Sequence, residues 1–116
     1  MHGCATGDAK ITRGYDLPAQ YVIHTVGPVW HGGASGEEAL LASCYQKCFK
    51  LAGENNLRSI AFPAISTGVY GFPKRKAALI AVRETQKALA ENEALKRVLL
   101  VCFNGETRQA YEEALQ

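Results

Sequence analysis

The residues best suited to chemistry lie in one short segment, residues 66–72, with the sequence Ser-Thr-Gly-Val-Tyr-Gly-Phe. Gly68 and Gly71 permit positive φ angles and let a ligand approach the backbone closely. Where such a segment follows a buried strand and opens a helix, its backbone N–H groups and the helix dipole converge on one point. We therefore predict an anion site, with two hydroxyl side chains as further donors and the rings of Tyr70 and Phe72 as flat apolar walls.

A plain turn that binds nothing is the alternative for this segment. The chain has neither a Gly-x-x-x-x-Gly-Lys-Ser/Thr pattern nor a Gly-x-Gly-x-x-Gly pattern, which argues against an NTPase loop. We favour the anion site, because two glycines flanking aromatic residues are an unusual composition for a simple connection.

The other polar candidates are weaker. His24 lies within an expected strand and fits a hydrogen-bonded core histidine better than a catalyst. Trp30 and His31 lie in a glycine-rich stretch, where they either flank a ligand or cover the core. Asp8 and Asp16 occupy turn-like settings in which aspartate is common. No nucleophile with a positioned base is evident.

Two of the four cysteines, Cys44 and Cys48, are four residues apart, which places them on one face of a helix. That spacing suits a metal, but no second ligand pair accompanies it. Free cysteine behaves as a small buried hydrophobe. We expect core positions and no metal, because the same stripe carries apolar residues: Leu40, Leu41, Tyr45, Phe49 and Ala52.

Length and composition indicate one ordinary globular domain, residues 1–116, with 47% hydrophobic and 21% charged residues. A net charge of +2 is too small to indicate a nucleic-acid or membrane partner. The basic run Lys74-Arg75-Lys76 is expected to be a solvated helix start. Without a signal sequence or an apolar span, the chain is expected to be cytoplasmic.

The first half of the chain predicts two strands and a helix. Residues 21–26 are β-branched and aromatic and end at Gly27-Pro28, which predicts a strand. Residues 9–12 are expected to pair with it in antiparallel direction. Ser35 and Glu38 have the spacing of a capping box, so a helix is expected from there to about Ala52.

The second half predicts strand, helix, strand, helix. Strand 59–62 is expected to be buried on both faces, and strand 98–103 is continuously apolar. Pro73 suits the first position of a helix that ends near Asn92, and a last helix follows Asn104-Gly105. The pattern indicates parallel strands covered by helices on both faces, with ligands bound in loops 63–73 and 104–105. The expected inward-facing residues of these helices are Ala77, Ile80, Ala81, Glu84, Ala88, Leu89, Ala110, Tyr111, Ala114 and Leu115.

Several blocks of the chain resemble one family. The segment Ile65-Ser-Thr-Gly-Val-Tyr-Gly-Phe-Pro73 is similar to the diphosphate loop of macrodomains, which bind ADP-ribose. Further matching blocks are Cys4-Ala-Thr-Gly-Asp-Ala-Lys-Ile-Thr12, Tyr21-Val-Ile-His-Thr-Val-Gly-Pro28 and Val101-Cys-Phe-Asn104. The resemblance implies a three-layer α/β/α macrodomain-like mixed sheet. It is strongest to the bacterial group that removes acetyl from O-acetyl-ADP-ribose or ADP-ribose from acidic side chains.

The resemblance also implies roles for individual residues. Backbone amides of Ser66, Thr67, Gly68, Val69 and Tyr70 would wrap the diphosphate, within a loop that also contains Ile65, Gly71 and Phe72. Gly68 and Tyr70 would lie beside the distal ribose and are the catalytic candidates. Phe103 would stack on adenine, unless it is simple core, and Asn104 would lie near the adenosine ribose. No cofactor is implied.

In the family, a preceding segment supplies an Asn-Ala-Ala-Asn block and a glycine-rich loop with an aspartate, which position the ribose and activate water. Neither is found in these residues, so the resemblance implies that the catalytic half of the site and the N-terminal strands are missing. The absent strands would leave a sheet edge open to another chain. A shortened reading frame, a deliberate truncation and completion by a partner remain equal explanations.

Three functions follow from the resemblance. The first is hydrolysis of ADP-ribose esters by ordered water, with Tyr70 and loop amides stabilising the developing charge. The second is a non-catalytic module that binds ADP-ribose or O-acetyl-ADP-ribose. The third is a structural fragment or subunit that forms a homo-oligomer through the exposed sheet edge.

Overall fold

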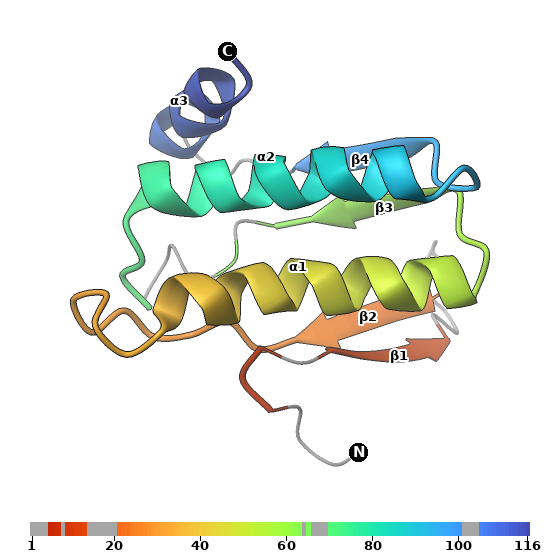
Figure 1. Ribbon diagram of the computed structural model, residues 1–116, viewed down its shortest axis with the longest axis horizontal. Helices are drawn as coiled ribbons and strands as arrows, with labels where there is room; N and C mark the ends of the chain where they lie inside the picture. Colours follow the sequence, from red (N-terminus) through yellow and green to blue (C-terminus); the bar gives the residue numbers. More distant parts are fainter. Residues whose placement is uncertain (1–4, 8, 14–20, 64, 66–69, 101–104) are drawn as a thin grey trace.

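The computed structural model describes residues 5–7, 9–13, 21–63, 65, 70–100 and 105–116 (Figure 1). Strands and helices alternate in its second half, as the sequence predicts. In chain order the elements are β1 (Ala9–Arg13), β2 (Tyr21–Thr25), α1 (Glu37–Glu54), β3 (Ser59–Phe62), α2 (Lys74–Glu91), β4 (Arg97–Leu100) and α3 (Gly105–Ala114).

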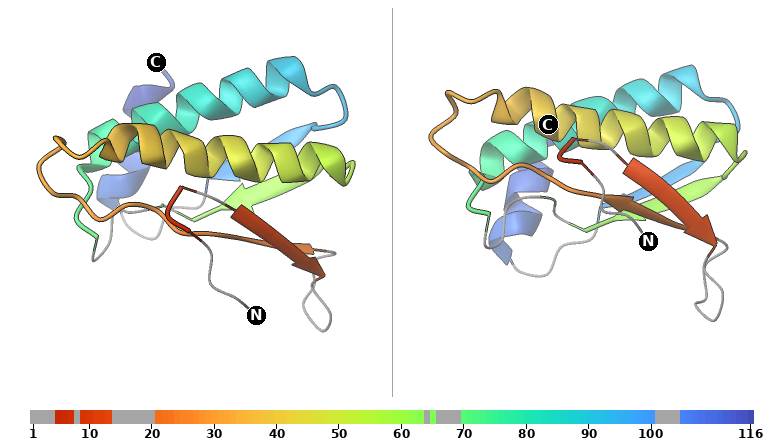
Figure 2. Two further views of the ribbon diagram at one scale, coloured as in Figure 1. Left: turned by 60° about the horizontal axis from the view of Figure 1, so that its bottom comes forward. Right: turned by 90° about the horizontal axis from the view of Figure 1, so that it is seen from below.

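The described strands form two separate pairs. β1 and β2 are antiparallel, with Ile11 opposite Ile23, and this confirms the predicted pairing. β3 and β4 are parallel, with Phe62 opposite Leu100, because the chain returns through helix α2 before it adds the second strand. The two pairs lie under the helices as distinct ribbons (Figure 2).

Helices α1 and α2 lie side by side over the strands, and α3 packs against α2 near one end of the molecule (Figures 1 and 2). The stripe predicted for α1 is buried except for the half-buried Leu40, and Cys44 and Cys48 are at 0% and 1% exposure. Phe62 of β3 contacts two aromatic rings of α1, those of Tyr45 at 5.0 Å and Phe49 at 5.2 Å between centroids. These rings belong to a core that α1, β3, α2 and α3 share.

The prediction that strand 59–62 is buried on both faces is wrong. Ala61 and Leu99 are paired neighbours on β3 and β4, and both are exposed. Phe62 is buried on the opposite face. The strands are apolar on both faces, but within the described residues only one face is covered. Residues 101–104 lie outside the described part, so the predicted continuation of the last strand stays a prediction.

The observed helix ends and buried helix faces agree with the predicted ones at most positions. α2 ends at Glu91, with Asn92 as its C-cap, which agrees with the predicted end near Asn92. Pro73 is the N-cap residue, one position before the helix starts, whereas it was predicted as the first helical residue. Leu89 and Leu115 were expected to face inward, but they are 39% and 61% exposed. Leu89 lies in the last turn of α2, and Leu115 directly follows α3. Among the described residues, no helix has the length and hydropathy needed to cross a membrane.

Candidate functional site

The predicted anion loop connects the end of β3 to the start of α2. Ile65 is partly buried against the core at the beginning of this loop. Ser66, Thr67, Gly68 and Val69 lie outside the described residues, as do Phe103 and Asn104 of the predicted adenosine contacts. The structure therefore describes the end of the loop, from Tyr70 onward, and the predictions for these other residues stay predictions.

The end of the loop makes a sharp change from surface to core. Tyr70 is 39% exposed, whereas Phe72 is 2% exposed. Gly71 lies between them with a φ of 72°, in the left-handed region that favours glycine. The burial of Phe72 leaves it no open face, so its ring supports the loop from the core instead of forming the expected apolar wall.

Replacing Gly71 by alanine is expected to lower the free energy of unfolding by about 1–2 kcal/mol, the cost of a left-handed conformation for a residue with a Cβ. A Cβ at Gly71 would meet no atom within 4 Å, so backbone strain alone is tested. Gly105→Ala is the matched control, because a Cβ there is equally free and no positive φ is involved. Urea unfolding of both variants measures the difference, and equal midpoints would refute the strain.

Trp30 connects the segment after β2 to the end of the loop. Its backbone N–H donates a hydrogen bond to the carbonyl oxygen of Tyr70 at 2.8 Å. Its ring lies 4.8 Å from the ring of Phe72, at an interplanar angle of 56°. The ammonium group of Lys76 lies 5.7 Å from the Trp30 ring centroid, within cation–π range. Of the two roles left open for Trp30, its contacts favour covering the core beneath the loop, while His31 is exposed.

Glu37, which the sequence did not single out, organises the segment between Trp30 and α1. Its side chain is 1% exposed. Its carboxylate accepts hydrogen bonds from the backbone N–H groups of His31, Gly33 and Ser35 at 2.8, 2.9 and 2.7 Å. The hydrogen bond from His31 is the main cause that lowers the pKa of Glu37 to about 2, although burial acts in the opposite direction.

The predicted capping box of Ser35 and Glu38 is wrong. The residue before α1 is Gly36, in a left-handed conformation with no side-chain cap. Glu38 is exposed and lies 3.9 Å from the Lys76 ammonium. A signal for Glu37 was present, because it follows a segment with three glycines. All three adopt positive φ and curl the backbone around its carboxylate: Gly32, Gly33 and Gly36.

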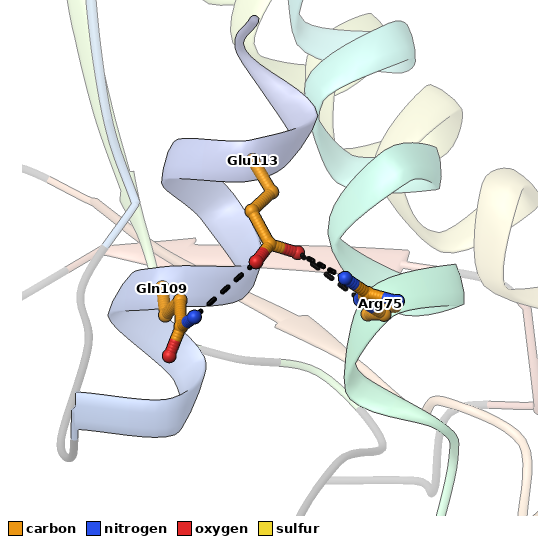
Figure 3. Close-up of polar contacts among 3 residues, drawn as sticks. All are labelled: Arg75, Gln109 and Glu113. Atoms are coloured by element: carbon orange, nitrogen blue, oxygen red, sulfur yellow. Dashed lines mark hydrogen bonds and ion pairs between the residues drawn. The ribbon is translucent and has the colours of Figure 1, made fainter.

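The basic run at the start of α2 is paired with acidic side chains of α3. The Arg75 guanidinium lies 2.9 Å from the Glu113 carboxylate, which also accepts a hydrogen bond from Gln109 at 3.3 Å (Figure 3). Lys74 pairs with Glu106, and this hydrogen bond lowers the pKa of Glu106. Arg75 and Lys76 are exposed, as expected of a solvated helix start, and the ion pairs give the groove between α2 and α3 matched charges.

Cys44 and Cys48 take the predicted core role. The Cys44 thiol donates a hydrogen bond to the carbonyl oxygen of Val26 at 3.4 Å, which ties α1 to the end of β2. In the part of the chain that the structure describes, no three His, Cys, Asp or Glu side chains are grouped so that they could hold a metal ion.

Comparison with known sequences decides the family. The sequence model of the Macro domain family matches residues 1–81. The chain belongs to the macrodomain family. This macrodomain is 54% identical over 115 residues to a macro domain-containing protein of Chlorobaculum tepidum, covering 99% of this chain and 67% of that protein. It is 56% identical over 112 residues to a protein named O-acetyl-ADP-ribose deacetylase from Klebsiella pneumoniae, covering 97% of this chain and 64% of the relative.

A solved structure of the family shares the fold. The Trypanosoma brucei macrodomain in complex with ADP-ribose superposes with a TM-score of 0.89 at 43% identity, over 98% of this chain and 47% of that one. The macrodomain resemblance and the α/β macrodomain fold predicted from the sequence are thus confirmed. The chain spans about two thirds or less of the length of these relatives.

Proposed function

We propose that this macrodomain recognises ADP-ribose-type ligands, with the diphosphate bound by loop 65–73 at the start of α2. The observation that carries the proposal is the placement of this loop. It leaves the carboxyl end of β3, turns at Gly71 and enters an 18-residue helix. The first N–H groups of a helix have no intrahelical acceptor and are favourable for an anion. A deacetylase among the relatives and ADP-ribose in a solved neighbour support the same ligand.

Within the proposal, the roles of individual residues follow the family pattern. Ser66, Thr67, Gly68, Val69 and Tyr70 donate backbone N–H groups to the diphosphate, and Gly68 and Tyr70 border the distal ribose. The exposure of Tyr70, at 39%, is consistent with contact to a ligand. Phe103 and Asn104 contact the adenosine end, since they follow β4 in the sequence, and the carboxyl end of β4 lies beside that of β3 in the parallel pair.

The proposal separates binding from turnover. These 116 residues contain the diphosphate loop but no Asn-Ala-Ala-Asn block. We therefore expect the chain to bind ADP-ribose and to leave O-acetyl-ADP-ribose largely unhydrolysed, because the groups that orient the ribose and water in the family are not among its residues. Release of acetate at a rate typical of a full-length relative would contradict this part of the proposal.

ADP-ribose is expected to raise the melting temperature of the purified chain. At a ligand concentration about 100 times Kd, the stabilisation is about 2.7 kcal/mol by mass action. Differential scanning calorimetry over a range of ligand concentrations measures the shift. Adenosine is the matched control, since it lacks the diphosphate that the loop is proposed to bind. An unchanged melting temperature at millimolar ADP-ribose would rule out the proposal.

The exposed face of β3 and β4 favours a second candidate, self-association. Leu99 is 44% exposed next to the exposed Ala61, so this face presents apolar surface to the solvent. Static light scattering of the free chain separates the two functions. A monomer that binds ADP-ribose supports the first, and a dimer that does not bind supports the second.

A further inference from the structure

The strongest unexplained feature outside the loop is the buried carboxylate of Glu37. Both of its oxygens are occupied: Oε2 accepts the N–H groups of His31 and Gly33, and Oε1 accepts that of Ser35. At 1% exposure, the side chain has no surface to offer a ligand. Any effect of Glu37 on the proposed site must therefore act through the backbone segment that it holds.

That segment closes over the ring of Trp30. A Cβ built on Gly33 would lie 2.8 Å from Cη2 of the indole, closer than real Cβ atoms approach other atoms. The backbone of residue 33 and the Trp30 ring are thus in tight contact. The Gly33 N–H donates a hydrogen bond to the Glu37 carboxylate, so the carboxylate also fixes where the backbone of Gly33 contacts the indole.

Trp30 in turn contacts the end of the proposed ligand loop on both sides of Gly71. Its N–H donates to the carbonyl oxygen of Tyr70 at 2.8 Å, and its ring packs against Phe72 at 4.8 Å. One contact comes from the backbone and one from the side chain, so the position and the orientation of Trp30 both constrain the loop.

We propose that Glu37 is a positioning residue for the ligand loop: its carboxylate fixes residues 31–35, which hold Trp30 against Tyr70 and Phe72. This inference rests on the proposed function and deepens it. Glu37 lies at the start of α1 and the loop at the start of α2, so the connection joins the ends of two helices that are neighbours in space. Preorganising a loop in its bound conformation raises affinity by lowering the entropy lost on binding.

Trp30 is the single tryptophan of the chain, so its fluorescence reports on this connection without any label. Glu37→Gln keeps the shape of the side chain but replaces one acceptor oxygen by an NH₂ group, which cannot accept a backbone N–H. We expect the folded variant to show red-shifted Trp30 emission, stronger quenching by acrylamide, and ADP-ribose binding weakened by about tenfold. Glu91→Gln removes the same charge from an exposed site at the end of α2 and is expected to change none of these three readouts.

A pair of glycine variants tests the same connection without altering the carboxylate. Gly32 and Gly33 have nearly equal φ angles, +92° and +91°, so an alanine is similarly strained at either position. A methyl group at Gly32 meets no atom within 4 Å, whereas one at Gly33 meets the Trp30 ring. Gly33→Ala is therefore expected to shift Trp30 emission and to weaken ADP-ribose binding relative to Gly32→Ala, by about tenfold.

Affinity and emission are measured by titration well below the unfolding transition, so that only folded protein contributes. A role confined to stability would lower the melting temperatures of Glu37→Gln and Gly33→Ala and leave both readouts at wild-type values, which overturns the proposal. If Glu37→Gln does not fold, the glycine pair gives the answer. If the wild type does not bind ADP-ribose, the proposed function fails. Trp30 emission then still decides whether Glu37 fixes this segment, and unchanged emission refutes it.

Discussion

Replacing Phe72 by alanine is expected to lower the free energy of unfolding by about 3–5 kcal/mol, the usual cost of removing a buried phenylalanine. The ring is 2% exposed and packs against Trp30, so its loss opens a cavity beneath the end of the loop. Small domains have total stabilities of about 5–15 kcal/mol, so this loss is a large fraction of the free energy of unfolding. Urea unfolding, followed by circular dichroism, measures the change.

Tyr70→Ala is the matched control for Phe72→Ala, because Tyr70 is an aromatic residue two positions earlier in the same loop. At 39% exposure it is expected to contribute about 1 kcal/mol or less to stability. Under the proposed function, it should instead weaken ADP-ribose binding. The expected result is a separation: one variant loses stability and the other loses affinity. Equal destabilisation by both would contradict the contrast between the buried and exposed ends of the loop.

Acidification is expected to destabilise the wild type between about pH 4.5 and about pH 2, and Glu37→Gln is expected to lack this component. The pKa of Glu37 is lowered from 4.5 to about 2 in the folded protein. A carboxylate with a lowered pKa contributes stability that is complete above its unfolded value and is lost as the pH falls through its folded value. Unfolding in this window should take up about one proton through Glu37.

Melting temperatures recorded from neutral pH down to about pH 2 test this expectation. Glu106 also has a lowered pKa, through its hydrogen bond with Lys74, and contributes to acid sensitivity with the same sign. Glu106→Gln is therefore the control. Its exposed ion pair is expected to contribute little, and the curve of this variant should remain close to that of the wild type. Parallel curves for Glu37→Gln and the wild type would exclude a special role of the Glu37 carboxylate.

The sequence predicted the elements of the fold because their signals are local. The Gly-Pro turn after residue 26 predicted the end of the second strand, and helical spacing predicted the buried stripe of α1 with Cys44 and Cys48. Pro73 marked the start of α2 to within one residue. The loop motif and the blocks around it identified the family, since a run of specific residues in order carries more information than periodicity.

Burial of the parallel strands was not predictable in the same way. Ala61 and Leu99 are apolar, and their sequence does not say whether a neighbouring layer covers them. In the described structure these two residues are exposed, while Phe62 is buried against α1. Burial depends on what lies opposite a side chain, and that is a property of the packed molecule.

The ligand loop has some features that the sequence determined and others that only the tertiary structure decided. Its glycines, its place before a helix and its family were determined by the sequence alone, because φ preferences and motif order are properties of the chain. The connection from Glu37 through Trp30 to Tyr70 was decided only by the tertiary structure. Local rules favoured Ser35 and Glu38 as the helix cap, whereas the folded backbone brings three N–H groups around the neighbouring carboxylate. Hydrogen bonds between segments depend on where the chain returns in space, which no local pattern encodes.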